Sequence, residues 1–231
     1  MNILRFLYPP KNKCILCGVK CEKSLCNICS TSIQFIHERK CMKCGKGLSE
    51  DYDKNICPDC LERNYSFHSA YSCFYYEGAG RELIHKLKYE GKLEVGKILA
   101  RYMAYEAKAE NLNADVIVPV PIHESKLARR GFNQAKVIGE HLSEMLSIPL
   151  WDCLIRKRDT KEQSSLDKTG RRLNVIDAFS LNMLYNVNNM RILLIDDVYT
   201  TGSTVDECSK VLLASGAKQI NVLTGAAGVN T

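Results

Sequence analysis

Residues 192 to 204 read Ile-Leu-Leu-Ile-Asp-Asp-Val-Tyr-Thr-Thr-Gly-Ser-Thr. They place an apolar run, two adjacent carboxylates and a hydroxyl-rich turn in succession, just before a stretch with helical periodicity. The apolar run at 192–195 predicts a buried strand of a parallel sheet. Asp196 and Asp197 then fall at its carboxyl end, which is where open α/β sheets bind ligands.

The turn after the acid pair predicts a seat for an anion. Its hydroxyls come from Thr200, Thr201, Ser203 and Thr204. Gly202 lets a ligand approach the backbone closely, and the N–H groups that open the next helix face an anion along the favourable end of the helix dipole. Since sugar hydroxyls prefer carboxylate acceptors and phosphate prefers backbone donors, this order of residues predicts a site for a sugar 5-phosphate.

The chain around this motif alternates between strand and helix patterns. Further strands are predicted at 114–121 and 220–223, and helices at 81–89, 94–108, 132–147 and 203–214. This alternation predicts an α/β fold with a mostly parallel sheet. An aromatic, β-prone stretch at 64–76 marks a change of character, and we expect a small module at residues 1–66 and a larger domain at 67–231.

Cysteines dominate the small module. Of twelve in the chain, eight form four Cys-x-x-Cys pairs, which are Cys14/Cys17, Cys26/Cys29, Cys41/Cys44 and Cys57/Cys60. Each pair can present two thiolates to a tetrahedral ion, and two pairs complete a closed structural site, so the sequence predicts two zinc ions. A cross-braced module would interleave the pairs, whereas sequential ribbons would join the first with the second and the third with the fourth. We expect sequential ribbons.

Composition limits the class of protein. A chain of 231 residues with 45% hydrophobic residues has room for one large domain and one small module. No run reaches the roughly 18 apolar residues of a membrane span, and the start is too short for a secretory signal, so we expect a cytoplasmic protein. The formal charge of +6 falls to about +2 once two four-thiolate zinc sites are counted, and overall basicity therefore gives no support for nucleic-acid binding.

The motif at 192–204 resembles the binding motif of type I phosphoribosyltransferases, which hold 5-phosphoribosyl-1-pyrophosphate. Joined to the four cysteine pairs, it resembles the ComF family of bacterial competence proteins over nearly the whole chain. Further matching stretches are Leu83-Ile84-His85-Lys86-Leu87-Lys88-Tyr89, Val118-Pro119-Val120-Pro121, Arg130-Gly131-Phe132-Asn133-Gln134-Ala135, Arg171-Arg172-Leu173-Asn174-Val175 and Ala178-Phe179.

The resemblance implies a type I phosphoribosyltransferase-like sheet with helices on both faces, preceded by a double zinc ribbon. It assigns the ribose hydroxyls to Asp196 and Asp197, directly or through Mg²⁺, and the 5-phosphate to residues 200–204. It assigns the pyrophosphate to the loop at 119–123, including Pro119, Val120 and Pro121. A closing loop would supply the remaining catalytic candidates, namely Lys161, Gln163, Arg171 and Arg172.

Three hypotheses about function follow from the resemblance. In the first, the chain is a competence factor that binds phosphoribosyl pyrophosphate and handles incoming single-stranded DNA with a helicase-like partner, the ribbons being its contact module. In the second, it is a working phosphoribosyltransferase on a small base or amine, and the ribbons only stabilise the chain. The third makes the larger domain an inactive scaffold, against which the intact acid pair and hydroxyl-rich turn argue. No motif in the sequence identifies an acceptor.

Overall fold

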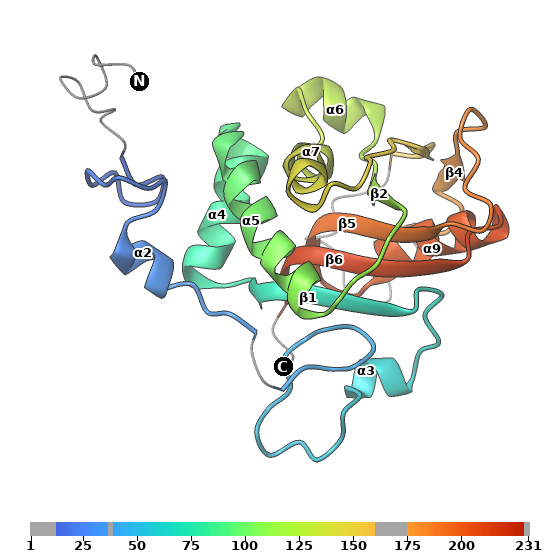
Figure 1. Cartoon of the computed structure of the whole chain (residues 1–231), viewed down its shortest axis with the longest axis horizontal. Helices are drawn as coiled ribbons and strands as arrows, with labels where there is room; N and C mark the ends of the chain where they lie inside the picture. Colours follow the sequence, from blue (N-terminus) through green and yellow to red (C-terminus); the bar gives the residue numbers. More distant parts are fainter. Residues whose placement is uncertain (1–12, 37–38, 160–174, 229–231) are drawn as a thin grey trace.

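The structure is a computed structural model, and it describes residues 13–36, 39–159 and 175–228. Within these residues, four parallel strands form a central sheet in the order β1-β6-β5-β2 (Figure 1). The strands are β1 (Ser69–Tyr75), β2 (Val116–Pro119), β5 (Arg191–Tyr199) and β6 (Gln219–Ala227). A short antiparallel pair, β3 (Leu154–Arg156) with β4 (Phe179–Leu181), stands apart from this sheet.

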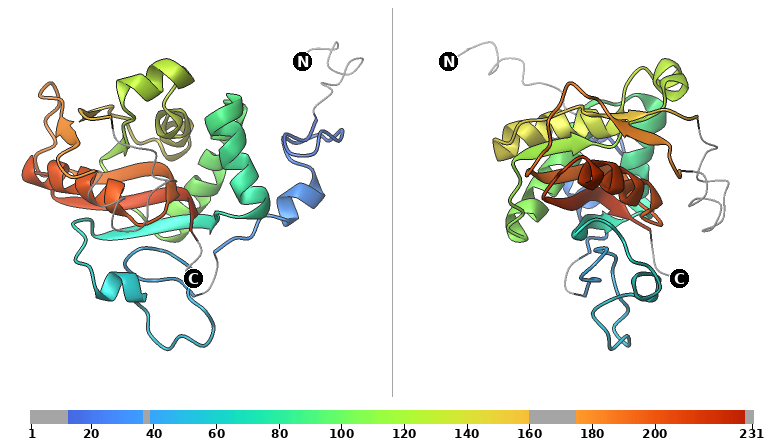
Figure 2. Two further views of the ribbon diagram at one scale, coloured as in Figure 1. Left: turned by 180° about the vertical axis from the view of Figure 1, so that it is seen from behind. Right: turned by 90° about the vertical axis from the view of Figure 1, so that its right-hand side faces the viewer.

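Helices cover both faces of the sheet (Figures 1 and 2). Three of them, α4 (Gly78–Glu90), α5 (Glu94–Ala109) and α7 (Gln134–Leu146), pack together on one face, and α9 (Ser203–Ala214) packs on the other. Both faces of the sheet need a cover because the apolar side chains of β5 alternate between them. Ile192 and Leu194 lie in the core beside α9, and Leu193 and Ile195 lie in the core on the opposite face. The predicted α/β class, with a mostly parallel sheet covered on both sides, is confirmed.

Several predicted elements differ from the observed ones at their ends. Strand β5 does not stop at Ile195 but continues through the acid pair to Tyr199, because β6 pairs with it as far as Ala227. Helix α4 begins at Gly78, ahead of the predicted start at residue 81. The helix α6 (Glu124–Arg130) was not predicted. Among the described residues, no helix has the length and apolar character needed to cross a membrane.

The second half of the cysteine-rich region packs directly on β1. Ile36 N donates to Cys73 O at 3.0 Å, and Ala70 N donates to Lys43 O at 2.8 Å. Figure 1 shows this region, with α3 (Pro58–Leu61), beneath the sheet, whereas α2 (Asn27–Thr31) lies to one side near α4. The part of the chain that contains Cys41, Cys44, Cys57 and Cys60 therefore folds together with the sheet.

Candidate functional site

The described part of the chain contains two groups of four cysteines whose sulfur atoms lie within 4.8 Å of one another. The first cysteine cluster is Cys14, Cys17, Cys26 and Cys29, and the second cysteine cluster is Cys41, Cys44, Cys57 and Cys60. Sulfur atoms approach to 3.7 Å in the first (Cys17 to Cys26) and to 3.6 Å in the second (Cys44 to Cys57). A zinc–sulfur distance of 2.3 Å gives a tetrahedron with edges of about 3.8 Å, so both clusters fit zinc.

Both clusters use the same local structure, and they join the cysteine pairs in sequence order as predicted. The first pair of each cluster lies on a tight turn, closed by Gly18 N to Cys14 O and by Gly45 N to Cys41 O, both at 2.8 Å. Both glycines have positive φ, +74° and +67°, which a side chain would disfavour. The second pair of each cluster lies at the start of a short helix, α2 or α3.

The acid pair is divided between two environments. Asp196 lines a small hollow at the start of α9, together with Thr200, Gly202, Ser203 and Thr204. We call this space the loop hollow, and residues 200–204 the hydroxyl loop. Asp197 is 2% exposed and does not line the loop hollow. Its Oδ2 lies 2.5 Å from Nζ of Lys88 in α4, on the other side of the sheet.

Burial and this ion pair set the protonation of the acids. Burial, and next to it the Asp197 carboxylate, raise the pKa of Asp196 well above its ordinary value. Burial opposes the charge of Lys88, but the Asp197 and Asp196 carboxylates outweigh that effect and raise the pKa of Lys88. Lys88 therefore stays a cation and compensates one carboxylate. Before folding is considered, only the place of Lys88 in a stretch that resembles the ComF family points to this partner, because β5 and α4 meet only in the folded chain.

The hydroxyl loop is held in a defined conformation. Gly202 has φ +73° and precedes α9, whose first turn leaves backbone N–H groups without partners inside the helix. Thr201 does not line the loop hollow, and its Oγ1 lies 2.9 Å from Ser203 Oγ. Asp196 and four residues of the hydroxyl loop thus line the loop hollow. Thr201 does not line it, but its side chain contacts Ser203, which does.

The remaining predicted residues lie beside this site or outside the described residues. Pro119 pairs with Ile195 in the sheet register, and Val120 N donates to Ile195 O at 2.9 Å, so residues 119–121 lie next to the acid pair. All three are buried, and none lines the loop hollow. Asn133 holds this segment, because its Nδ2 donates to Val120 O at 3.0 Å. The predicted closing-loop residues Lys161, Gln163, Arg171 and Arg172 lie outside the described residues.

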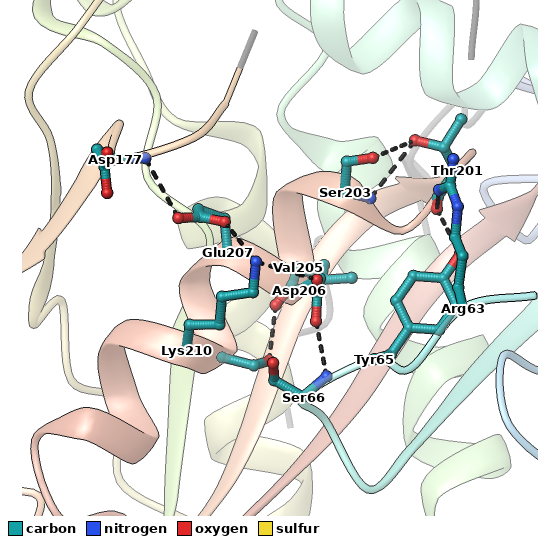
Figure 3. Close-up of polar contacts among 11 residues, drawn as sticks. Arg63, Tyr65, Ser66, Asp177, Thr201, Ser203, Val205, Asp206, Glu207 and Lys210 are labelled. Carbon is teal, nitrogen blue, oxygen red and sulfur yellow. Dashed lines mark hydrogen bonds and ion pairs between the residues drawn. The ribbon is translucent and has the colours of Figure 1, made fainter. Parts of the chain in front are cut away.

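A larger cavity of about 540 Å³ lies beside α9, and Ser203 at the start of this helix lines both this cavity and the loop hollow. Figure 3 shows the polar contacts of several of its lining residues. Its lining includes Arg63, Asp206, Glu207 and Lys210. These four side chains already bond to one another or to the backbone, as Lys210 Nζ does to Glu207 Oε2 at 2.9 Å. The acid pair takes no part in it. We therefore assign the candidate site to the smaller loop hollow, where the Asp196 carboxyl group and the hydroxyl side chains of the motif meet.

The chain is similar to several known proteins. The double zinc ribbon domain family matches residues 3–61. Competence protein F of Haemophilus influenzae is 31% identical over 232 residues, covering 96% of this chain and 97% of that protein. DNA utilization protein YhgH of Salmonella typhi is 31% identical over 218 residues, covering 90% and 94%. Among solved structures, glutamine phosphoribosylpyrophosphate amidotransferase from B. subtilis matches with a TM-score of 0.39 and 21% identity, over 56% of this chain and 25% of that one.

Proposed function

Because this chain belongs to the competence protein F (ComF) family, we propose that it binds 5-phosphoribosyl-1-pyrophosphate and acts in the use of DNA taken up by the cell. One observation carries the binding part of this proposal. The Asp196 carboxyl group, in the second half of β5, and the hydroxyl loop before α9 line the same hollow. A group that can accept hydrogen bonds from ribose hydroxyls thus lies beside a loop that can bind phosphate, and a sugar 5-phosphate requires both.

In this proposal Asp196 accepts hydrogen bonds from the ribose hydroxyls, directly or through Mg²⁺. Carboxylate oxygen is the donor that Mg²⁺ prefers, and Asp196 carries a raised pKa that a bound cation would lower. When bound, Mg²⁺ would neutralise charge on the pyrophosphate. The hydroxyls of Thr200, Ser203 and Thr204 and the start of α9 hold the 5-phosphate. Asp197 anchors this part of β5 to α4 through Lys88.

The DNA role draws on the names of the relatives, one a competence protein and the other a DNA utilization protein. We place the protein in the cytoplasm, with the ribbon module at residues 1–66 and the sugar-phosphate domain at 67–231. The zinc ribbons then form a contact surface for single-stranded DNA or a helicase-like partner protein.

Calorimetric titration of phosphoribosyl pyrophosphate with magnesium into the protein tests the binding part. The wild type is expected to bind, and the Asp196→Asn, Asp197→Asn variant is expected to lose roughly 10- to 100-fold in affinity, since the charged acceptor at Asp196 is lost together with the ion pair that anchors Asp197 to Lys88. Asp115→Asn is the matched control, because Asp115 lies at the other end of the same sheet and pairs with Arg191 at 2.7 Å. Undiminished binding by the double variant would refute the proposal.

Two further measurements separate the competence role from a transferase. Salt-sensitive binding of single-stranded oligonucleotides, without pyrophosphate release, is the expected result. Pyrophosphate release that requires one added base or amine would instead identify a phosphoribosyltransferase. Both measurements use the full chain with its zinc, because the second cysteine cluster packs in the same core as the sheet.

A further inference from the structure

The backbone of the hydroxyl loop is bonded to the segment that leaves the second cysteine cluster (Figure 3). We call this segment, residues 62–66, the linker. Its Tyr65 Oη donates to Thr201 O at 2.9 Å, and its Arg63 Nη1 donates to the same oxygen at 3.4 Å. Tyr65 and Thr201 are 136 positions apart in the chain. One carbonyl at the back of the loop thus accepts two donors from a distant segment.

The linker also holds the helix that follows the loop. Ser66 N donates to Asp206 Oδ1 at 2.7 Å, and Asp206 lies in the first turn of α9 (Figure 3). The linker therefore contacts both parts of the proposed phosphate seat, the hydroxyl loop and the start of α9. None of these linker atoms lines the loop hollow, so they act on the seat from behind.

Aromatic packing fixes the position of Tyr65. Its ring stacks on Phe67 with centroids 5.0 Å apart, and Phe67 meets the Tyr199 ring edge-on at 6.3 Å. A side chain on Gly202 would lie 2.2 Å from Tyr199 Oη and 3.1 Å from Tyr65 Cε1. The side chains of Tyr65 and Tyr199 thus pack closely against the backbone of the hydroxyl loop at Gly202. Burial raises the pKa of Tyr65, which keeps its hydroxyl a donor.

The second cysteine cluster belongs to this same packed unit. Its four cysteines are buried in one core with Tyr65, Phe67 and Tyr199. Lys46, two residues after Cys44, lies over the Tyr199 ring at 6.0 Å and pairs with Asp59 at 3.4 Å. Cys14 of the first cysteine cluster lies instead in the core on the opposite side of the sheet. The second cysteine cluster therefore packs with the residues that contact the hydroxyl loop, whereas Cys14 of the first cysteine cluster packs on the other side of the sheet.

We infer that the zinc-loaded second cysteine cluster holds the hydroxyl loop in its binding conformation, with Tyr65 as the positioning residue for the 5-phosphate. The inference rests on the proposed function, because it assumes that the hydroxyl loop binds that phosphate. The second ribbon is then part of the sugar-phosphate site, while the first ribbon is independent of it. Zinc at the second cysteine cluster controls ligand affinity without touching the ligand.

Tyr65→Phe tests this inference with the smallest change, since it removes one donor and keeps the ring. Ribose 5-phosphate and magnesium pyrophosphate are titrated separately into the full chain. Affinity for ribose 5-phosphate is expected to fall roughly 2- to 10-fold, as for the loss of one hydrogen bond, while affinity for pyrophosphate and the zinc content stay unchanged. A general loss of stability would weaken both ligands equally. Tyr105→Phe, at an exposed tyrosine of α5, is the matched control.

Cysteine variants test the role of zinc. Cys57→Ser with Cys60→Ser is expected to weaken ribose 5-phosphate binding by more than Tyr65→Phe does, whereas Cys14→Ser with Cys17→Ser is expected to leave it unchanged. If the wild type binds ribose 5-phosphate and Tyr65→Phe binds it equally well, the inference is overturned and the proposed function stands. If the wild type binds neither ribose 5-phosphate nor phosphoribosyl pyrophosphate, the proposed function fails and the inference falls with it.

Discussion

At the scale of single residues, the buried side chain of Asp196, which we propose for ligand binding, lowers the stability of the folded protein. Burial and the neighbouring Asp197 raise its pKa above the ordinary value of 3.8. Between pH 3.8 and the raised pKa, the folded protein keeps a proton that the unfolded chain has lost, so the free energy of unfolding falls as pH rises. The residue that we propose binds the ribose thus lowers the free energy of unfolding at neutral pH.

Asp196→Asn is therefore expected to increase the free energy of unfolding at pH 7 and to flatten its decline between pH 4.5 and pH 7, as measured by urea denaturation. Asp115→Asn should behave in the opposite way. Hydrogen bonds from Arg191 lower the pKa of Asp115 to about 2, so this carboxylate contributes stability that is present above pH 3.8 and is lost toward pH 2. An Asp196→Asn protein less stable than wild type at pH 7 would contradict this account of the acid pair.

At the scale of elements, the Lys88–Asp197 ion pair joins α4 to β5. The Asp197 side chain is 3% exposed and the Lys88 side chain 19%. Lys88→Met leaves a buried carboxylate without its partner and is expected to lower the free energy of unfolding by about 3 kcal/mol. Adding Asp197→Asn should restore part of that loss, which a double-mutant cycle by urea denaturation would measure. Strictly additive effects would show that the two side chains do not interact.

The sequence predicts the types of the main elements but not their ends or their contacts. Periodicity places α9 and β6, whereas the polar pair Asp196 and Asp197 looks like the end of a strand that in fact continues to Tyr199. Pairing with β6 decides this, and pairing is a tertiary property. The motif likewise predicts that Thr201 contacts phosphate. In the structure its carbonyl is held by Tyr65, and local sequence gives no sign of a contact so distant.

At the scale of the whole molecule, the cysteine-rich region is divided between the two cores of the protein. The second cysteine cluster shares a core with the buried side chains of α9, whereas Cys14 of the first cysteine cluster lies in the core with α4 and α5. We expect about two zinc ions per chain by elemental analysis. A four-thiolate site contributes roughly 10–16 kcal/mol of apparent binding energy, so chelation should lower the melting temperature and unfold the ribbons.

Circular dichroism with and without a strong chelator checks that expectation. Asp196→Asn is the control, because it should keep both zinc ions. A protein that contains no zinc after careful preparation, or whose melting temperature does not respond to chelation, would contradict the ribbon assignment.

A crystal soaked with phosphoribosyl pyrophosphate and magnesium tests the central claim most directly. We predict density for the 5-phosphate against the hydroxyl loop and the first turn of α9, with the ribose hydroxyls facing Asp196. Density for the sugar in the larger cavity beside Lys210, or an empty loop hollow at a saturating ligand concentration, would contradict the claim.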